Sequence, residues 1–308
     1  MSLQNRPMTT TPTGQFQAKR PPWQTGEDAG DELAPYPVTP GRGKRAGRLL
    51  VTGSSGGIGR VVTVGLRARG HFVRGADLKP GNAELDEFHA MDLGDADKVT
   101  AAAETMDTIV HLGGKRYFNE LDDGSRRANL DGVYHVYEAA REAGVGRVIL
   151  ASSVNVVLPL ATSGRTVTVD DADPRNHYAL LKLWAEGVAR MYWLEHGIAT
   201  VVLRIAAAPR TSRDVRWILN RERLAYRVSH RDLQRAFVLA TEADRPEFAK
   251  CYVASRQDGV ASPLDLEPGR RAIGYEPRDN FLEGLMFTPR IMEELASGDA
   301  ECGHVGRC

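Results

Sequence analysis

The chain has 308 residues with 40 basic and 40 acidic side chains, so its formal net charge at pH 7 is zero. This length can bury one large α/β domain with a smaller appendage, and the balanced charge indicates no nucleic-acid partner. The longest apolar stretches are as short as strands, whereas a membrane helix needs about 18 or more residues, so no membrane association is predicted. Three cysteines (Cys251, Cys302 and Cys308) are too few for a disulfide framework and fit the reducing cytoplasm.

The two ends of the chain differ from its middle. Residues 1–46 are polar and rich in proline, without a helical or strand period, so we expect a flexible arm. They contain no apolar segment of the kind found in secretory signals. Residues 290–308 are predicted to be a flexible tail. Cys302 and His304 lie in this tail with Cys308, but a fourth ligand is missing, so no metal site is predicted.

Between these ends, apolar runs alternate with segments of helical period. We predict strands at 48–52, 72–76, 87–91, 108–112, 146–152 and 199–205, a last short strand at 250–254, and helices over 123–143 and 177–196. This alternation is typical of βαβ units, so the sequence predicts an α/β Rossmann fold, a doubly wound parallel sheet, over 47–209. The Arg-rich residues 210–289 are expected to form a small C-terminal substrate-binding region.

A glycine-rich turn follows the first predicted strand and precedes an amphipathic helix. Such a turn lets the backbone approach a pyrophosphate and points the helix N-terminus at its negative charge. The next strand ends at Asp77, whose carboxylate can accept both ribose hydroxyls of NAD and would repel the extra phosphate of NADP. The sequence therefore predicts an NAD site, with a purely structural tight turn as the alternative. The predicted contacts in the turn are Gly53, Ser55, Gly56, Gly57, Ile58 and Gly59.

A serine at a predicted strand end is followed along the chain by a tyrosine and a lysine, a set of side chains that can oxidise a hydroxyl. The strand at 146–152 delivers Ser153 to the carboxyl edge of the sheet, where ligands of α/β folds bind. Tyr178 and Lys182 are spaced i, i+4 and share one face of a predicted helix. A phenol is a poor base at neutral pH, but a neighbouring cation favours its ionised form. We expect Tyr178 to take the substrate proton, Ser153 to orient the substrate oxygen and Lys182 also to hold the nicotinamide ribose. A tyrosine packed on a lysine stem at the helix surface is the alternative.

Together these motifs resemble the extended short-chain dehydrogenase/reductase superfamily, in its NAD-dependent epimerase/dehydratase group. The likeness is carried by Thr52–Gly59, Asp92-Leu93, His111–Gly114, Asn129-x-x-Gly132, Ala151–Ser153 and Tyr178-x-x-x-Lys182. Within this group the sequence is most similar to the uronate dehydrogenases, through His111–Gly114, Val136–Arg141, Ala189–Tyr192, Leu203–Ile205 and Ser229-His230. The likeness spans about residues 48–285.

The resemblance implies catalytic roles for Ser153, Tyr178 and Lys182, and a homodimer built from the helices over 123–143 and 177–196. It also implies further cofactor contacts by Asp92, Leu93, Leu112, Gly113, Gly114 and Asn129. From spacing alone, Asp92 could equally be a helix N-cap, and the two glycines could simply form a loop.

The resemblance further implies which residues touch the substrate. Uronate dehydrogenases oxidise the anomeric hydroxyl of a free hexuronic acid with NAD and give an aldarolactone. The implied contacts are Arg116, Ser153, Asn155, Ala207 and Arg216. Arg216 corresponds to the arginine that holds the substrate carboxylate, and a guanidinium fits a planar carboxylate. The sequence departs from the pattern at Val154 and Asn155, where the uronate enzymes have Asn and His, and at Arg116 and Ala207, where they have Ser.

The predicted function is an NAD-dependent dehydrogenase acting on a hydroxyl of a small, anionic sugar or sugar acid. The arginines after Pro209 favour an anion, although they could be a solvated helix face paired with Asp214, Glu222 and Asp232. A sugar or nucleotide-sugar epimerase with transient oxidation would use the same three catalytic residues. A dehydratase is less favoured, because no acidic pair follows Ser153. A redox-silent NAD-sensing module would have no need of the Tyr-Lys pair.

Overall fold

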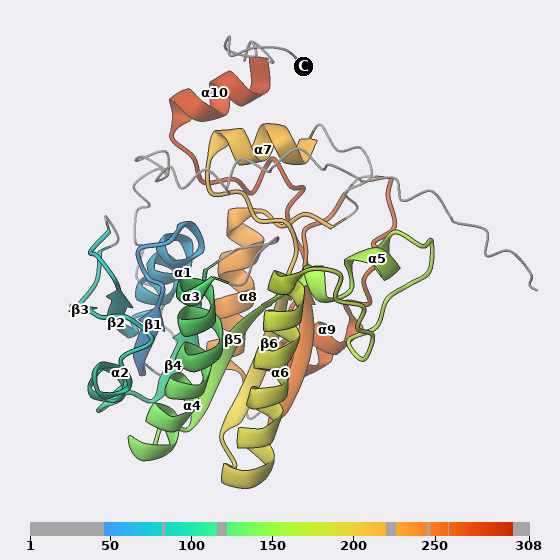
Figure 1. The fold of residues 1–308 in the computed structure, drawn as a ribbon. Coiled ribbons are helices and arrows are strands. Elements are labelled where there is room, and N and C mark those ends of the chain that lie inside the picture. Colours follow the sequence, from blue (N-terminus) through green and yellow to red (C-terminus); the bar gives the residue numbers. More distant parts are fainter. Residues whose placement is uncertain are drawn as a thin grey trace, which may run out of the picture.

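The computed structural model describes residues 46–81, 84–115, 122–219, 226–244, 247–257 and 259–297. Its centre is a seven-stranded sheet in which neighbouring strands pair in parallel (Figure 1). The strands are β1 (Arg48–Thr52), β2 (Phe72–Asp77), β3 (Glu87–Ala90), β4 (Thr108–His111), β5 (Arg147–Ser153), β6 (Ala199–Ile205) and β7 (Phe248–Val253). Their order is β3-β2-β1-β4-β5-β6-β7. The predicted Rossmann-type parallel sheet is therefore confirmed.

The strand order reverses direction next to β1. The chain runs outward from β1 to β3, and then returns to β4 on the other side of β1 and continues to β7. The reversal lies between β1 and β4, whose last residues, Thr52 and His111, are paired in register. Ligands of open α/β sheets bind outside the carboxyl ends of the strands at such a reversal, so we expect a binding site there.

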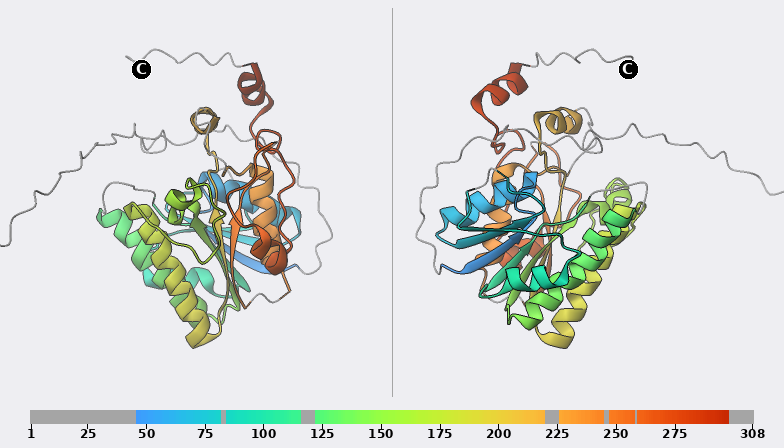
Figure 2. Two further views of the ribbon diagram at one scale, coloured as in Figure 1. Left: turned by 90° about the vertical axis from the view of Figure 1, so that its right-hand side faces the viewer. Right: turned by 60° about the vertical axis from the view of Figure 1, so that its left-hand side comes forward.

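Helices cover both faces of the sheet (Figure 2). The helical segments are α1 (Gly57–Ala68), α2 (Ala96–Ala103), α3 (Asp123–Arg126), η2 (Arg127–Asp131), α4 (Gly132–Glu142), η3 (Val154–Val156), α5 (Leu158–Ala161), α6 (His177–His196), α7 (Ser212–Leu219), α8 (His230–Glu242), α9 (Glu267–Ile273) and α10 (Pro289–Ser297). Helices α1 and α8 share one apolar core with the sheet, and α2, α4 and α6 share a second core on its other face.

The two cores follow from the alternation of side chains along each strand. In β1, Val51 joins the core beneath α1 and α8, whereas its neighbour Leu50 joins the core beneath α2, α4 and α6. In β4, Val110 and Ile109 divide in the same way, and all four side chains are fully buried. A strand covered on both faces must be apolar on both, which is why the sequence shows unbroken apolar runs here.

The helix predicted over 123–143 consists of three continuous pieces. A π-helical turn, η2, separates α3 from α4 and contains the buried Asn129. Such single π turns inside α-helices occur frequently at functional sites. The helix predicted over 177–196 is α6, which begins after Asn176, whose side chain accepts from the Ala179 amide, and ends at Gly197 in the left-handed conformation.

The part of the chain after residue 209 is joined to the sheet. Helix α8 packs against α1, and β7 extends the sheet beside β6, near the short strand expected at 250–254.

The sequence predicts a tail from residue 290, but Pro289–Ser297 form α10. The reason lies in a third apolar cluster, in which Ile291 packs with Val215 and Ile218 of α7. Figure 1 shows α7 and α10 together at one end of the molecule.

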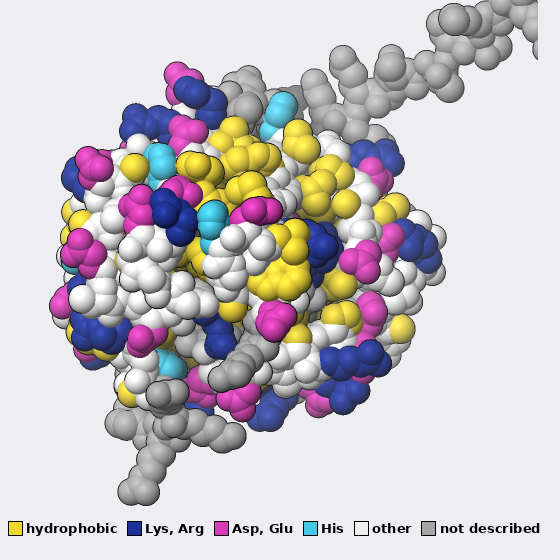
Figure 3. All heavy atoms as spheres, turned by 90° about the horizontal axis from the view of Figure 1, so that it is seen from below, with side chains coloured by type: hydrophobic (Ala, Val, Ile, Leu, Met, Phe, Trp, Pro, Cys, Tyr) yellow, Lys and Arg dark blue, Asp and Glu magenta, His cyan; other side chains and the backbone are white. Residues whose placement is uncertain are grey.

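The surface carries both charge signs. Figure 3 shows positive and negative side chains interspersed on the face seen from below, with hydrophobic side chains between them. This mixture agrees with the zero net charge of the chain. Among the described residues, no helix combines the length and the apolar character that crossing a membrane requires.

Candidate active site

The glycine-rich turn between β1 and α1 is packed against the end of β4. Gly53 has a φ of +71°, and a Cβ there would lie 2.7 Å from the Gly113 amide nitrogen. A Cβ at Gly59 would lie 2.1 Å from the Gly53 carbonyl oxygen. Only glycine fits at both positions. No described side chain caps α1 at Gly56, so the amide groups of its first turn face the site where the sequence places a pyrophosphate.

Asp77, at the end of β2, lies at the edge of this turn. Its Oδ2 accepts a hydrogen bond from the Ser55 amide at 3.0 Å, and its Oδ1 accepts from the Leu78 amide at 2.7 Å. The Ser55 hydroxyl donates to the Lys79 carbonyl oxygen at 2.7 Å. The turn and the carboxylate are therefore one hydrogen-bonded unit. A fixed carboxylate beside the turn is the group that binds the ribose hydroxyls of NAD in this fold, so these residues fit the cofactor.

The remaining cofactor candidates line the next two strand ends. Asp92 Oδ1 accepts from the Gly94 amide at 2.8 Å, whereas α2 is capped by Asp95, which accepts from the Lys98 amide. The alternative of Asp92 as the N-cap is therefore wrong. Leu93 packs beneath Gly113, where a Cβ would lie 2.6 Å from its Cδ1.

Asn129 joins the loop after β4 to the π turn. Its Nδ2 donates to the carbonyl oxygens of Lys115 and Ser125, each at 2.9 Å. A Cβ at Gly114 would lie 2.7 Å from Asn129 Oδ1, so this loop, which follows Leu112, passes directly over the amide. Asn129 thereby fixes the path of the glycine pair.

The three catalytic candidates lie on β5 and on the first turns of α6, which packs against β5. Ser153 is the last residue of β5, and Lys182 Nζ donates to the carbonyl oxygen of Ala151 on the same strand at 2.9 Å. Lys182 Nζ lies 5.8 Å from the centroid of the Tyr178 ring, one helical turn earlier. Tyr178, Lys182 and Ser153 are all buried. The lysine therefore fixes the distance between α6 and the strand that carries the serine.

The Ser153 hydroxyl is oriented by Asn155. Ser153 Oγ accepts hydrogen bonds from the Asn155 backbone amide at 3.2 Å and from Asn155 Nδ2 at 3.0 Å. With both acceptor positions used, the hydroxyl hydrogen points away from Asn155 and can be donated to a substrate oxygen. Asn155, which the resemblance assigns to the substrate, contacts Ser153 in this structure and positions it.

His111 supports the same edge without carrying charge. Its ring lies at the end of β4, fully buried, with Nδ1 2.7 Å from Thr52 Oγ1, which also accepts from the Gly113 amide at 3.2 Å. Burial, and secondarily the charge of Lys182, lowers the pKa of His111 to about 3. The imidazole is therefore neutral at physiological pH. It does not repel the positive charge of Lys182.

A buried ion pair that was not expected from the sequence lies behind α6. Glu186 accepts from Ser152 Oγ at 2.5 Å and from Arg204 Nε and Nη2 at 2.9 and 2.8 Å. Arg204 also donates to the carbonyl oxygen of Asp171 and to the hydroxyl of Tyr252. The signal was present, because Glu186 continues the i, i+4 series of Tyr178 and Lys182, and an arginine inside a buried strand needs a buried partner.

The candidate substrate residues lie on segments beside this edge. Arg216 is in α7, which follows β6, and is half-buried, while its neighbour Val215 is fully buried in the third apolar cluster. Ala207 packs against the same cluster. The structure brings Asn155 onto Ser153. Arg116 and Glu222 lie outside the described residues, as do Cys302, His304 and Cys308.

Two of the acids expected to balance a solvated arginine face are buried. Asp214 accepts from the backbone amides of Arg210 and Thr211 at 2.8 and 3.1 Å, and so caps α7. Asp232, at the start of α8, is completely buried. The interpretation of this part of the chain as a solvated face is therefore wrong for these two acids, because backbone amides and buried partners hold them.

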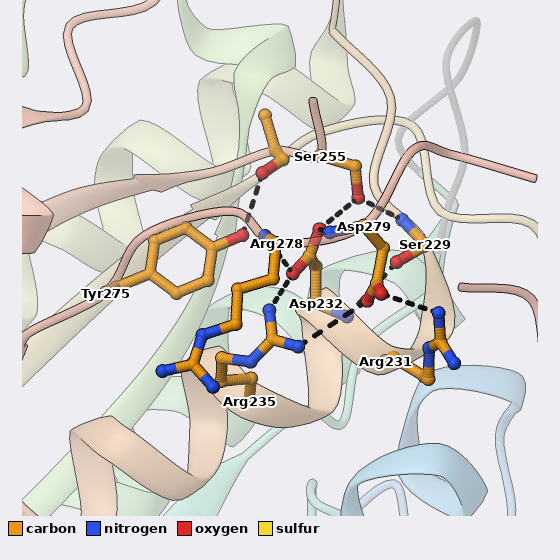
Figure 4. A network of polar contacts seen from close by, with 9 residues as sticks. Ser229, Arg231, Asp232, Arg235, Ser255, Tyr275, Arg278 and Asp279 are labelled. Carbon is orange, nitrogen blue, oxygen red and sulfur yellow. Dashed lines mark hydrogen bonds and ion pairs between the residues drawn. The ribbon is translucent and has the colours of Figure 1, made fainter. Parts of the chain in front are cut away.

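Asp232 is the centre of the network in Figure 4. Its carboxylate accepts from Ser255 Oγ at 2.7 Å and from the backbone amides of Arg278 and Asp279 at 3.0 and 3.2 Å. Arg235 Nη1 forms an ion pair with the same carboxylate. One buried acid thereby joins α8 to the segments after β7 and after α9. This network fixes the part of the chain after Pro209 to the segment that follows β7.

His230 makes a second connection within the part of the chain after β6. Its Nδ1 accepts from the Met286 amide at 2.9 Å, so the ring proton is on Nε2, which donates to the Pro209 carbonyl oxygen at 2.8 Å. The edge of its ring packs on Phe287 at a centroid distance of 4.9 Å. Burial lowers the pKa of His230 to about 4, opposed by the bond to Pro209. The Ser229-His230 motif therefore anchors the loop that leads to α7.

Comparison with known proteins agrees with this geometry. Residues 49–208 match the NAD dependent epimerase/dehydratase family, and the chain belongs to that family. It is 38% identical over 170 residues to a uronate dehydrogenase of Pseudomonas syringae pv. tomato, covering 52% of this chain and 59% of that protein. It is 30% identical over 253 residues to an L-arabinose 1-dehydrogenase (NAD(P)(+)) of Haloferax volcanii, covering 76% of this chain and 97% of that protein.

Solved structures show the same fold. A uronate dehydrogenase from Agrobacterium tumefaciens, a mutant in complex with NAD, superposes with a TM-score of 0.65 at 28% identity, over 85% of this chain and 92% of that chain. A glucuronic acid dehydrogenase from Chromohalobacter salexigens has a TM-score of 0.67 at 26% identity, over 85% and 92%. The chain spans about three-fifths of the length of the Pseudomonas uronate dehydrogenases that it matches.

Proposed function

We propose that this protein is an NAD-dependent dehydrogenase that oxidises a hydroxyl of a small sugar acid. The observation that carries the proposal is the arrangement of Ser153, Tyr178 and Lys182 at the carboxyl end of β5, two strands from the glycine-rich turn. A family member that only sensed NAD would not need a buried tyrosine and lysine beside an oriented serine hydroxyl. The similarity to uronate and arabinose dehydrogenases supports oxidation without return of the hydride.

Each of these residues has a separate role in the proposed reaction. Ser153 donates its hydroxyl hydrogen to the substrate oxygen and holds it, because Asn155 occupies its acceptor positions. Tyr178 takes the proton from that oxygen. Lys182, fixed on the Ala151 carbonyl, places a positive charge beside the phenol and next to the nicotinamide ribose. Bound NAD would supply the hydride acceptor for the carbon that carries this oxygen. Asp77 and the turn hold the adenosine half of the cofactor.

We propose that Arg216 binds the carboxylate of the substrate. Arg216 lies on α7, and Asp214 fixes the start of this helix. The buried face of α7 packs on Leu285 and Phe287, on either side of Met286, whose amide His230 binds. A guanidinium held in this way can form two parallel bonds to a planar carboxylate. The relatives named as uronate dehydrogenases act on such acids, and the relative named as an arabinose dehydrogenase acts on a neutral sugar. The charge of the substrate is therefore the property to test.

The test is NADH formation with free uronic acids, neutral aldoses and sugar phosphates, together with a product analysis. We expect net NADH with a uronic acid and little with the matched neutral aldose. An isomerised sugar formed without net NADH would identify an epimerase instead. Binding of NAD without turnover on any of these sugars would favour an NAD-sensing module and contradict the proposal.

The matched variant is Arg216→Ala. It should raise KM for the uronic acid and lower kcat/KM by roughly 30- to 1000-fold, with a smaller change in kcat, because it removes a charge-assisted contact to a part of the substrate that does not react. Arg216→Lys should recover part of the loss, since an ammonium cannot reproduce the planar geometry. Arg213→Ala, at an exposed residue of the same helix, is the control. Equal losses in both alanine variants would contradict a specific carboxylate contact.

We also propose a homodimer that forms through α4 and α6. Exposed apolar side chains recur along one face of α6 at Leu180, Trp184, Met191 and Leu194, and Tyr134 of α4 is exposed as well. Their spacing of four and three residues forms a single stripe, with Gly187 between. An apolar stripe on two adjacent helices is typical of a protein interface.

The buried free thiol of Cys251 supports a cytoplasmic location for the enzyme.

A further inference from the structure

An arginine from the loop after β6 lies across the glycine-rich turn. A Cβ at Gly57 would lie 2.6 Å from Cγ and 2.8 Å from Cβ of Arg210. The aliphatic part of Arg210 therefore occupies the space that any side chain at position 57 would need. The sequence assigns Gly57 to close approach of the cofactor, but the structure shows close approach of Arg210.

Arg210 is held in this position from both sides. Asp214 Oδ2 accepts from its backbone amide at 2.8 Å and lies 3.7 Å from its Nε. The carbonyl oxygen of the preceding Pro209 accepts from His230 Nε2 at 2.8 Å. About 30% of the Arg210 side chain is exposed, although its Nε is buried. The backbone is fixed by a buried acid and a buried histidine, and the stem is fixed by the turn.

Gly57 is the first residue of α1, the helix whose N-terminus faces the expected pyrophosphate. A cation beside that helix end complements the two phosphate charges and can donate charge-assisted hydrogen bonds. We propose that Arg210 binds the pyrophosphate of NAD from the side of the substrate region. This inference rests on NAD occupying the glycine-rich turn, as the proposed function requires, and is independent of which sugar is oxidised.

The loop after β6 would then contribute to both the cofactor site and the substrate site. The same short segment carries Arg210 towards the cofactor and, six residues later, Arg216 towards the proposed substrate. Asp214 caps the helix between them and contacts both the Arg210 and the Thr211 amides. A contact of Arg210 with the phosphates would therefore fix the helix that carries Arg216 when the cofactor is bound.

The experiment separates the charge of Arg210 from its packing. Arg210→Met keeps an unbranched stem over Gly57 and removes the guanidinium. Binding of ADP-ribose, which contains the pyrophosphate but no nicotinamide, is measured by calorimetry, and binding of adenosine, which contains no phosphate, by NMR titration. We expect Arg210→Met to weaken ADP-ribose by roughly 10- to 100-fold and to leave adenosine within about twofold, given the strength of hydrogen bonds to charged groups. Arg210→Lys should fall between, and Arg213→Met should match the wild type.

Three results would overturn the inference. Unchanged ADP-ribose binding by Arg210→Met would mean that the stem only packs on the turn. An equal loss for adenosine and ADP-ribose would mean that the variant disturbs the whole site. A raised KM for the sugar with unchanged ADP-ribose affinity would assign Arg210 to the substrate. A wild-type protein that binds no ADP-ribose would refute the cofactor assignment itself, which distinguishes that failure from the others.

Discussion

At the scale of single residues, the candidate site depends on hydrogen bonds that leave the hydroxyl hydrogen of Ser153 available for the substrate. Ser153 Oγ accepts twice from Asn155, and Lys182 Nζ donates to the Ala151 carbonyl oxygen. Both groups are buried, so their orientation is set by the protein and not by solvent. We propose that the serine hydroxyl hydrogen and the Tyr178 hydroxyl are the two groups that contact the substrate oxygen.

Tyr178→Phe tests the assignment of the base. The change removes one hydroxyl and keeps the ring that packs beside Lys182, so the fold and the cofactor turn should be unaffected. We expect kcat to fall by roughly 10²- to 10⁴-fold, the usual contribution of a general base, with NAD affinity nearly unchanged. Stopped-flow turnover and a fluorescence titration with NADH measure the two quantities. Near-normal kcat would mean that another group takes the proton.

Asp77→Ala tests the choice of cofactor. Asp77 lies against the Ser55 amide at the edge of the turn, where its charge would repel the additional phosphate of NADP. We expect the ratio of kcat/KM for NAD to that for NADP to fall towards one. The exposed Asp123→Ala is the control, because it lies outside the turn. If the ratio is the same in Asp77→Ala and in the wild type, another residue sets the preference.

At the scale of elements, two buried polar connections hold the catalytic and substrate segments. The Glu186–Arg204 pair joins α6 to β6 and reaches the loop at Asp171, whereas His230 and Asp232 join α8 to the segments after Pro209 and after β7. Each connection links parts of the chain that are not adjacent in the sequence. Breaking either connection should therefore destabilise several segments of the site at once.

Arg204→Leu should destabilise the fold through its partner. The change leaves Glu186 buried with an uncompensated charge, which costs about 3–5 kcal/mol in the free energy of unfolding. The double variant Glu186→Gln, Arg204→Leu should recover part of this loss. Arg270→Leu, which breaks a surface pair with Glu267, is the control and should cost about 1 kcal/mol or less. Urea denaturation measures all four proteins. A small effect of Arg204→Leu alone would contradict the importance of the pair.

His230 should make stability depend on pH. Its folded pKa is about 4, below the usual value of about 6.5, so the unfolded chain binds more protons between these values. The contribution of the neutral ring is therefore complete above about pH 6.5 and is lost as the pH falls towards 4, by an amount of about 3 kcal/mol.

His230→Gln, which cannot titrate, is the variant that tests this pH dependence. The free energy of unfolding of this variant should vary less between pH 7 and pH 5 than that of the wild type, because the variant lacks the His230 titration. His111 is present in both proteins and contributes equally to both slopes. Denaturant titrations at both pH values measure the difference. Identical slopes would show that His230 does not titrate as proposed.

At the scale of the whole molecule, the sheet is covered on both faces and the outer face of α6 carries the apolar stripe. Residues on that stripe have 38% to 59% of their surface exposed, which is unusual for leucine, methionine and tryptophan on one helix. A second copy of the chain that packs α4 and α6 against the same helices would cover it. The candidate catalytic residues Tyr178 and Lys182 are buried on the opposite face of α6, so the proposed interface does not cover them.

Met191→Glu with Leu194→Glu tests the dimer without touching the catalytic turn of α6. We expect the wild type to be dimeric and this variant to be monomeric by light scattering at micromolar concentration, because burying two carboxylates is unfavourable. Val260→Glu, at an exposed apolar residue of a different segment, should remain dimeric. A wild-type monomer would contradict the interface, and a dimer unaffected by the double change would place it elsewhere.

Patterns in the sequence were sufficient to predict the order of the strands and helices and the parallel sheet, and they supplied Ser153, Tyr178 and Lys182 as catalytic candidates. These follow from short-range patterns, namely strand and helix periods, the glycine-rich turn and the i, i+4 spacing of Tyr178 and Lys182. The tertiary structure alone decided which distant residues meet. Only the packed fold places Arg210 on Gly57, Arg204 on Glu186 and α10 on α7. Such contacts depend on the paths of separate segments across the sheet, and no local period in the chain records them.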